Sequence, residues 1–155
     1  MTHAPQTRLA TWVDLNAVAS LFDAYRQFYA QAPDLALATA FIRARMAANE
    51  SVILLALDAQ GLAIGFCQLY PSFCSVEAQP IYTLYDLFVA PQARRCGAAR
   101  ALLLAAKALA TSRQVARMDL TTARTNQSAQ ALYASLGWVR DDVFLAYNQR
   151  ITAHQ

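Results

Sequence analysis

The chain has few of the residues on which many catalytic and metal-binding sites depend. Its 155 residues include only two histidines, His3 and His154, and each is close to a terminus. A Ser-His-Asp triad, a histidine-ligated metal and a histidine general base are therefore not expected. The three cysteines, Cys67, Cys74 and Cys96, lack the spacing of a zinc site. Because this small, odd number also argues against a disulfide scaffold, it favours a reducing, cytoplasmic location.

Glycine, proline and charge are scarce as well. The 4 glycines and 5 prolines exclude collagen-like and linker-rich chains. The net charge of +3 comes from 12 arginines and Lys107 against 10 acidic residues, which is too mild and scattered for a nucleic-acid surface. The longest nearly apolar stretch, residues 101–110, is interrupted by Lys107 and is far shorter than the roughly 20 residues that span a bilayer. We therefore expect neither nucleic acid nor a membrane as a partner, and Pro5, Gln6 and Arg8 argue against a signal peptide.

Apolar residues are abundant by contrast, at 57% of a chain of ordinary single-domain length. We expect one domain over residues 1–155, with its core over about 8–151. The predicted strands cover residues 9–13, 51–57, 63–70, 81–89, 116–122 and 144–151, and the predicted helices cover 15–28, 35–48, 97–111 and 126–136. We expect Asp14 to cap the first helix, Leu37, Phe41 and Met46 to be buried in the second, and residues 71–80 to form a loop. This order predicts an α/β (α+β) fold in which strands 81–89 and 116–122 are parallel.

The clearest chemical signal is a strand that ends in a basic turn and continues as a helix. Small residues there allow an anion to approach the free N–H groups of the first helical turn, where the helix dipole adds positive potential. The small and charged residues are Arg94, Arg95, Gly97, Ala98, Ala99 and Arg100. Neither a Walker P-loop nor a G-x-G-x-x-G motif is present. The turn predicts a diphosphate site, and the alternative is an ordinary helix N-terminus with solvated arginines.

Two blocks of residues resemble the GNAT superfamily of acetyl-CoA-dependent N-acetyltransferases. The family signature (Q/R)-x-x-G-x-(G/A) is matched by Arg94-Arg95-Cys96-Gly97-Ala98-Ala99, which follows Phe88, Val89 and Pro91 and precedes Leu102-Leu103. The second block, Asn-x-x-(S/A)-x-x-x-Tyr-x-x-x-Gly-(F/W), is matched by Asn126, Ala129, Tyr133, Gly137 and Trp138. Both blocks stand in the family's order and spacing, and the order of elements agrees over about residues 8–151.

The resemblance implies a GNAT-like fold, with a central twisted mixed sheet of six to seven strands flanked by about four helices. It also implies acetyl-CoA as co-substrate and no metal. Backbone groups at Leu87, Phe88 and Val89 would pair with the pantetheine arm. The remaining residues implied in cofactor binding are Arg94, Arg95, Cys96, Gly97, Ala98, Ala99 and Arg100 at the diphosphate, and Asn126, Ala129 and Tyr133 along the arm.

Tyr133 is expected close to the thiol sulfur of the cofactor. A phenol there could donate a proton to the departing thiolate, and the alternative is a tyrosine that packs in the core. Asn126 also suits a helix N-cap, and the two roles can coexist. Cys96 occupies a variable position of the motif, and we do not expect it to act as a nucleophile.

The acceptor amine must lose a proton before it attacks. An aliphatic amine has a pKa of about 10.4, so about 4.6 kcal/mol separates it from its neutral form at pH 7. Many relatives place a glutamate on the strand before the basic turn, but here Tyr85 holds that position and Asp86 follows it. We expect these two residues to act through water, with Asp86 on the opposite sheet face unless a bulge redirects it. The alternative for Asp86 is a structural acid bonded to the backbone.

A group of five aromatic residues and one glutamine is expected to line the acceptor pocket, because aromatic faces suit an amine stem or a cation. Its members are Tyr25, Tyr29, Gln68, Tyr70, Phe73 and Tyr82. Core packing is the alternative for each aromatic residue. The expected activity is direct transfer of an acetyl group to a small-molecule primary amine (polyamine, aminoglycoside or amino-acid-like), with a homodimer left open. The alternatives are a protein or peptide amine as acceptor, and a non-enzymatic acetyl-CoA-binding module.

Overall fold

A computed structural model describes residues 4–151, and the chain divides between Thr121 and Thr122 into two units. The elements of the first unit are β1 (Gln6–Leu9), α1 (Leu15–Phe28), α2 (Leu35–Ala47), β2 (Val52–Leu57), β3 (Ala63–Cys74), β4 (Gln79–Val89), α3 (Ala98–Ser112) and β5 (Met118–Asp119). The second unit contains α4 (Gln127–Ser135). This is the expected mixed α+β fold with four α-helices among the described residues.

The described strands form one sheet in the order β1-β2-β3-β4-β5. The first four are antiparallel, and β5 runs parallel to β4, which confirms the predicted parallel pair. The predicted loop over residues 71–80 is wrong, because β3 and β4 continue as a hairpin to the pair Cys74–Gln79. Beyond Leu69, β3 has no pairing with β2, so Pro71 can lie on an edge where its missing N–H is tolerated.

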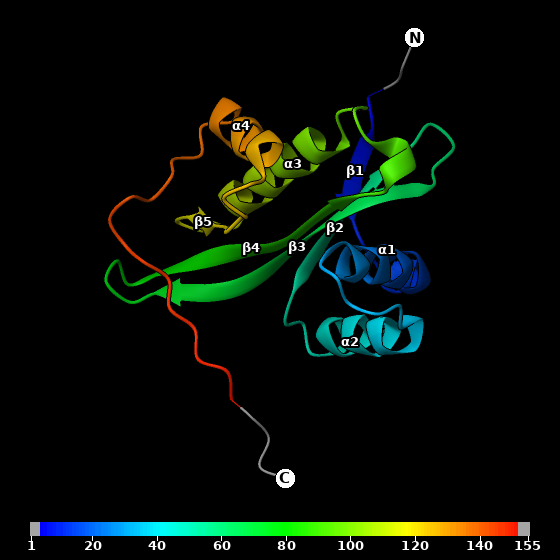
Figure 1. The fold of residues 1–155 in the computed structure, drawn as a ribbon, viewed down its shortest axis with the longest axis horizontal. Helices are drawn as coiled ribbons and strands as arrows, with labels where there is room; N and C mark the ends of the chain where they lie inside the picture. Colours follow the sequence, from blue (N-terminus) through cyan, green and yellow to red (C-terminus); the bar gives the residue numbers. More distant parts are fainter. Residues whose placement is uncertain (1–3, 152–155) are drawn as a thin grey trace. The chain divides into compact units, whose positions relative to one another are not determined.

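The helices of the first unit cover both faces of its sheet (Figure 1), with α1 and α2 on one face and α3 on the other. The core between α1, α2 and the sheet is built from Val18, Leu21, Phe22, Ala38, Ile42, Ile53, Leu55, Phe66, Phe88 and Ala90. In α2 the buried residues are Ala38 and Ile42, whereas Leu37 is 51% exposed and Phe41 and Met46 are only half-buried. The sequence of α2 places apolar side chains on all sides of the helix, so the spacing of apolar residues does not predict which face is buried.

The entry to α1 differs from the predicted one. The first strand ends at Leu9, and a short 3-10 turn, Trp12–Asp14, follows it. Asp14 does not cap α1 with its side chain, because its carboxylate receives hydrogen bonds from Arg8 at 2.7 Å and from the Thr11 N–H at 2.8 Å. This ion pair turns the chain from β1 into α1.

The second unit begins α4 with Asn126, whose side-chain oxygen accepts a hydrogen bond from the Ala129 N–H at 3.2 Å. This confirms the predicted N-cap. The predicted last strand, residues 144–151, does not form, and Phe144 and Tyr147 are 80% and 89% exposed. The described part of this unit contains no other strand to pair with that backbone. The described sheet therefore has five strands instead of six to seven.

Within residues 4–151, no helix has the length and apolar character needed to cross a membrane.

Candidate functional site

The basic turn (residues 94–99) joins β4 to α3 through an irregular backbone. After the short 3-10 turn Pro91–Ala93, Arg95 has φ of 62° and Gly97 has φ of 85°, and α3 begins at Ala98. A Cβ built on Gly97 would meet no atom within 4 Å, so the space over the turn is open. The first N–H groups of an α-helix have no partner within the helix. The turn therefore combines donors, helix dipole and open space in the way an anion requires.

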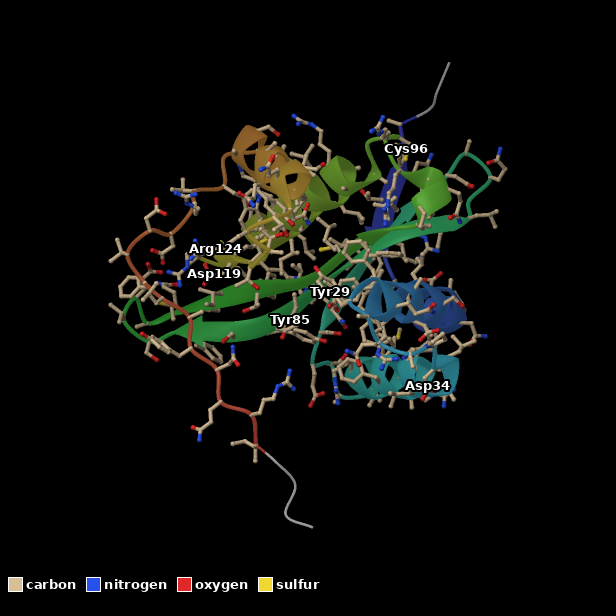
Figure 2. The ribbon with its side chains drawn as sticks, viewed as in Figure 1. Tyr29, Asp34, Tyr85, Cys96, Asp119 and Arg124 are labelled. Atoms are coloured by element: carbon tan, nitrogen blue, oxygen red, sulfur yellow. The ribbon has the colours of Figure 1, made fainter. Side chains whose placement is uncertain are left out.

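The arginines and the cysteine of the turn differ in their contacts. The Nε of Arg94 donates to the carbonyl oxygen of Val89 at 3.2 Å, and its guanidinium lies 5.7 Å from the Phe28 ring centre. The Cys96 thiol, labelled in Figure 2, donates a hydrogen bond to the carbonyl oxygen of Ala93 at 2.8 Å. This contact supports a local structural role for Cys96. Arg95 is exposed. The guanidinium of Arg94 is thus turned back onto the strand, whereas Arg95 lies at the surface of the turn.

One edge of β4 is open beside this turn. β5 pairs with β4 only at Tyr82 and Thr83, and no other described strand pairs with that edge from Leu84 to Val89. On its other edge, Phe88 pairs with Phe66 and Val89 pairs with Gly65. An extended ligand that carries amide groups could add to the open edge as a further strand would.

A β-bulge interrupts β4 at Tyr85. Asp86 pairs with Gln68 and Leu84 pairs with Leu69, so Tyr85 is the extra residue without a pairing partner on β3. The Tyr85 ring lies 5.6 Å from the ring of Tyr70, and the Asp86 carboxylate accepts a hydrogen bond from Gln68 Nε2 at 2.5 Å. Because Gln68 and Tyr70 lie two residues apart on one strand, they share a sheet face. The bulge therefore brings Tyr85 and Asp86 to the same face.

Tyrosines from α1 reach this part of the sheet. The Tyr25 hydroxyl donates to the Tyr85 carbonyl oxygen at 3.3 Å, and the rings of Tyr25 and Tyr29 are 5.1 Å apart. Figure 2 shows Tyr29 near the end of α1 and Tyr85 on the sheet. The structure thus gathers four of the predicted acceptor residues, Tyr25, Tyr29, Gln68 and Tyr70, around Tyr85 and Asp86. We call these six residues the tyrosine cluster.

Two predicted acceptor residues lie elsewhere. Tyr82 is 5% exposed, and its hydroxyl accepts a hydrogen bond from Arg113 at the end of α3, at 3.0 Å. It therefore lies on the α3 side, since the bulge reverses the alternation of β4 between Tyr82 and Asp86. Phe73 is 78% exposed near the end of the β3–β4 hairpin, because the strand continues past the place where a loop was expected.

Burial dominates the electrostatics of the tyrosine cluster. Asp86 is 3% exposed, and this burial raises the pKa of its carboxyl, while the hydrogen bond from Gln68 and the nearby Tyr25 hydroxyl lower that pKa in part. Burial also raises the pKa of Tyr70 to about 12, and it raises the pKa of Tyr25 further with help from the charge of Asp86. The pKa of the neighbouring Cys67 thiol is raised by the same two causes. These raised pKa values argue against a phenolate nucleophile at Tyr25 or Tyr70 and against a thiolate at Cys67.

Gly65 is a residue of this region that the sequence analysis missed. A Cβ at this position would lie 2.8 Å from the carbonyl oxygen of Phe88 and 3.2 Å from the Val89 side chain. Only glycine allows β3 to approach the end of β4 this closely. A glycine inside a predicted strand is the signal that could have revealed it.

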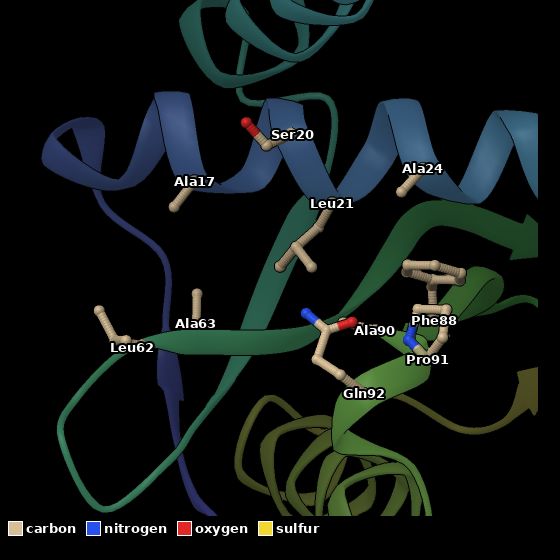
Figure 3. Close-up of a pocket in the computed structure, with 10 residues that line it drawn as sticks. All are labelled: Ala17, Ser20, Leu21, Ala24, Leu62, Ala63, Phe88, Ala90, Pro91 and Gln92. Atoms are coloured by element: carbon tan, nitrogen blue, oxygen red, sulfur yellow. The ribbon is translucent and has the colours of Figure 1, made fainter. Parts of the chain in front are cut away.

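A pocket of about 470 Å³ lies between α1 and the neighbouring ends of β3 and β4 (Figure 3). It is lined by Ala17, Ser20, Leu21, Ala24, Leu62, Ala63, Phe88, Ala90, Pro91 and Gln92. None of these side chains titrates near neutral pH, so the pocket offers packing space and no acid or base. Nor does the part of the chain that the structure describes hold any group of three or more His, Cys, Asp or Glu side chains suited to a metal, and His3 and His154 lie outside that part.

In the second unit, Tyr133 is half-buried on α4, and its ring centre lies 6.0 Å from that of Trp138. The backbone N–H of Trp138 donates to the Tyr133 carbonyl oxygen at 3.1 Å, and this hydrogen bond stabilises the turn that follows α4. The predicted roles of Asn126, Ala129 and Tyr133 toward a cofactor stay predictions.

Comparison with known proteins gives a consistent result. The model of the acetyltransferase (GNAT) family matches residues 15–138. An uncharacterised N-acetyltransferase of Bacillus subtilis (strain 168), YhfO, is 45% identical over 146 residues, which are 94% of this chain and 97% of that protein. The crystal structure of a probable acetyltransferase has a TM-score of 0.89 at 37% identity, covering 96% of this chain and 99% of the other.

A more distant structure shares the fold alone. The aminoglycoside N-acetyltransferase AAC(6')-Iy in complex with CoA has a TM-score of 0.78 at 20% identity, covering 97% of each chain. The family model and the 45% identical relative each extend over most of the sequence. The chain belongs to the GNAT family of acetyltransferases.

Proposed function

We propose that the chain works as one N-acetyltransferase domain that moves an acetyl group from acetyl-CoA to a primary amine of a small molecule. The acceptor is a polyamine, an aminoglycoside or an amino-acid-like amine, and the amine attacks the thioester directly. The observation that carries this proposal is the open edge of β4 from Leu84 to Val89, which leads directly into the basic turn. That arrangement suits one ligand with an amide-bearing arm and a diphosphate.

On the cofactor side, the chain's own groups would bind acetyl-CoA and orient its thioester. Backbone groups of Leu87, Phe88 and Val89 would pair with the arm, and a strand amide near Phe88 would stabilise the oxyanion of the tetrahedral intermediate. The basic turn and Arg100 would hold the diphosphate, with the open space at Gly97 as the place of closest approach. Asn126 and Ala129 would contact the arm. The thioester supplies the activated acetyl group.

On the acceptor side, the tyrosine cluster would receive the amine. Its aromatic faces suit an amine stem. The pKa of Asp86 is raised by burial, so this carboxyl is a weak partner for a second cationic group of the acceptor. We propose that the amine proton leaves through water contacted by Tyr85, Asp86 and backbone carbonyls, with no single carboxylate dominating. The rate should then rise with pH toward the acceptor's own pKa, since the neutral amine is the reactant.

Tyr133 would complete the reaction by donating its phenolic proton to the departing thiolate. We further propose a cytoplasmic location, which the three free cysteines support.

The test is an acceptor panel that follows release of free thiol from acetyl-CoA. The panel contains polyamines, aminoglycosides, amino acids and a peptide with a free N-terminus, and the folded variant Gly97→Glu serves as the control with a damaged diphosphate site. We expect turnover with at least one small amine and little with the variant. Turnover with the peptide alone would identify a protein or peptide acetyltransferase. Binding of acetyl-CoA without turnover of any amine would identify a non-enzymatic module.

A further inference from the structure

We propose that Tyr25 and Gln68 are positioning residues that hold the bulge of β4 in the shape that acetyl transfer requires. The inference rests on the proposed function, because it concerns the strand whose amides would stabilise the oxyanion. It concerns two residues that are otherwise expected only to line the acceptor pocket.

The bulge lies at a point of β4 where strand pairing is missing. Tyr85 is the extra residue between the pairs Leu84–Leu69 and Asp86–Gln68, so β3 gives it no paired neighbour. On the opposite edge, no described strand pairs with β4 beyond Thr83. Tyr85 therefore has no strand-pairing partner of its own, so side-chain contacts can hold its backbone, and its backbone direction sets the direction of the amides that follow it.

Tyr25 supplies the first of these side-chain contacts. Its hydroxyl donates to the Tyr85 carbonyl oxygen at 3.3 Å. Its ring lies 6.0 Å from the Phe66 ring and 6.2 Å from the Phe88 ring, both of which belong to the core under α1. Because core packing fixes the ring, the hydroxyl has a fixed position from which to hold the bulge.

Gln68 supplies the second contact. Its side chain is fully buried, and its Nε2 donates to Asp86 Oδ2, directly after the bulge. The Oε1 atom of the same amide is buried without a hydrogen-bond partner. A buried amide oxygen left unpaired costs free energy, so packing alone does not explain a glutamine at this position. Its function as the partner of Asp86 does.

The consequence for transfer follows from geometry. Amides that stabilise an oxyanion are worth about 100- to 1,000-fold in kcat, and they act only when they point at the developing charge. A displacement of about 1 Å in a positioned group can cost about 100-fold in rate. Loss of the Tyr25 hydroxyl would let the Tyr85 carbonyl rotate and would misdirect the amides at Leu87 and Phe88, without touching the diphosphate site.

The experiment compares Tyr25→Phe and Gln68→Met with Thr39→Val. The Thr39 hydroxyl also donates to a backbone carbonyl, that of Leu35 at 2.7 Å, but on α2 and outside the cluster. Each protein is measured for kcat with the best acceptor, for acetyl-CoA affinity by calorimetry, and for the backbone amide chemical shifts of residues 84–88. Should Gln68→Met fail to fold, Tyr25→Phe decides alone.

We expect Tyr25→Phe to lower kcat by about 10- to 100-fold, to leave acetyl-CoA affinity within about twofold, and to shift the backbone amides from Tyr85 through Phe88. Thr39→Val should change none of these. Unshifted amides in Tyr25→Phe, or a loss of kcat no larger than that of Thr39→Val, overturn the inference. A wild-type protein that turns over no amine refutes the proposed function instead, and the amide shifts still decide whether Tyr25 holds the bulge.

Discussion

The Nε atom of Arg94 lies 3.2 Å from the carbonyl oxygen of Val89 and donates a hydrogen bond to it. The first residue of the basic turn is thus tied to the last residue of β4. The same guanidinium lies over the rings of Phe28 and Phe88, at 5.7 Å and 6.0 Å from their centres. Arg94 therefore holds the turn against the strand. The turn would then have its geometry before an anion binds to it.

The diphosphate site can be tested at Gly97. Gly97→Glu would place a negative charge in the open space over the turn, so we expect acetyl-CoA affinity to fall by more than about tenfold, which is about 1.4 kcal/mol. The matched control is Gly61→Glu, because Gly61 also has a positive φ, 81°, and its Cβ would also meet no atom within 4 Å. Calorimetry on both variants separates charge at the site from backbone strain. Equal affinity in the two folded variants would remove the diphosphate from this turn.

The proton donor can be tested at Tyr133. Tyr133→Phe removes one hydroxyl and keeps the ring that packs near Trp138, so the fold should survive. We expect kcat to fall by about 10- to 100-fold or more with little change in acetyl-CoA affinity. Tyr147→Phe is the control, since Tyr147 is 89% exposed in the same unit and has no proposed role. Turnover in Tyr133→Phe equal to that of the control would return Tyr133 to a packing role.

The close approach of β3 to β4 can be tested at Gly65. Gly65→Ala would place a methyl group 2.8 Å from the Phe88 carbonyl oxygen, so β3 and β4 must separate along the stretch of β4 whose opposite edge would bind the cofactor arm. We expect unfolding stability to fall by about 1–3 kcal/mol, as for other overpacked sites, together with weaker acetyl-CoA binding. Urea unfolding and calorimetry measure the two effects. A variant as stable as the wild type would show that the strands can adjust without cost.

The buried carboxyl of Asp86 predicts a pH dependence of stability. Because burial raises its pKa above the ordinary 3.8, the native state keeps a proton that the unfolded chain loses between 3.8 and the raised value. Within that window stability falls as pH rises. Asp86→Asn removes the titrating group, so the variant should lose less stability than the wild type between acid and neutral pH.

The control for this prediction is Asp14, whose pKa is shifted in the opposite direction to that of Asp86. The Arg8 guanidinium lowers the pKa of Asp14, so the contribution of Asp14 is present above pH 3.8 and is lost as the pH falls. Asp14→Asn should therefore be most destabilised near neutral pH. Urea unfolding at a series of pH values measures both variants. Parallel pH profiles for wild type and Asp86→Asn would contradict a raised pKa of Asp86 in the native state.

Much of the fold could be predicted because local rules and long-range packing agree there. The span of α1 and the N-cap of α4 follow from apolar spacing and from Asn126. The parallel pairing of β4 with β5 follows from the helical crossover between them, which returns the chain to the end of the sheet where β4 began. The basic turn carries its own signal in glycine, small residues and arginines.

What could not be predicted depends on contacts that the sequence does not mark. Pro71 reads as a loop residue, but it lies on an edge of β3 where no N–H is needed. The bulge at Tyr85 depends on the register between two strands, and it separates Tyr82 from the tyrosine cluster. The apolar and aromatic run at residues 144–147 suggests a strand, yet a strand also requires a paired neighbour, which the second unit does not provide among its described residues.

The most direct test of the central claim follows a labelled acetyl group from acetyl-CoA through a single turnover. The protein, acetyl-CoA labelled on the acetyl carbon, and the best amine of the panel are mixed and quenched, and the label on the amine and on the intact protein is measured by mass spectrometry. Direct transfer predicts that the label appears on the amine at the rate of thiol release, and that no acetylated chain accumulates with or without the amine. Label that remains on acetyl-CoA with every amine, or that passes first through the protein chain, would contradict the account.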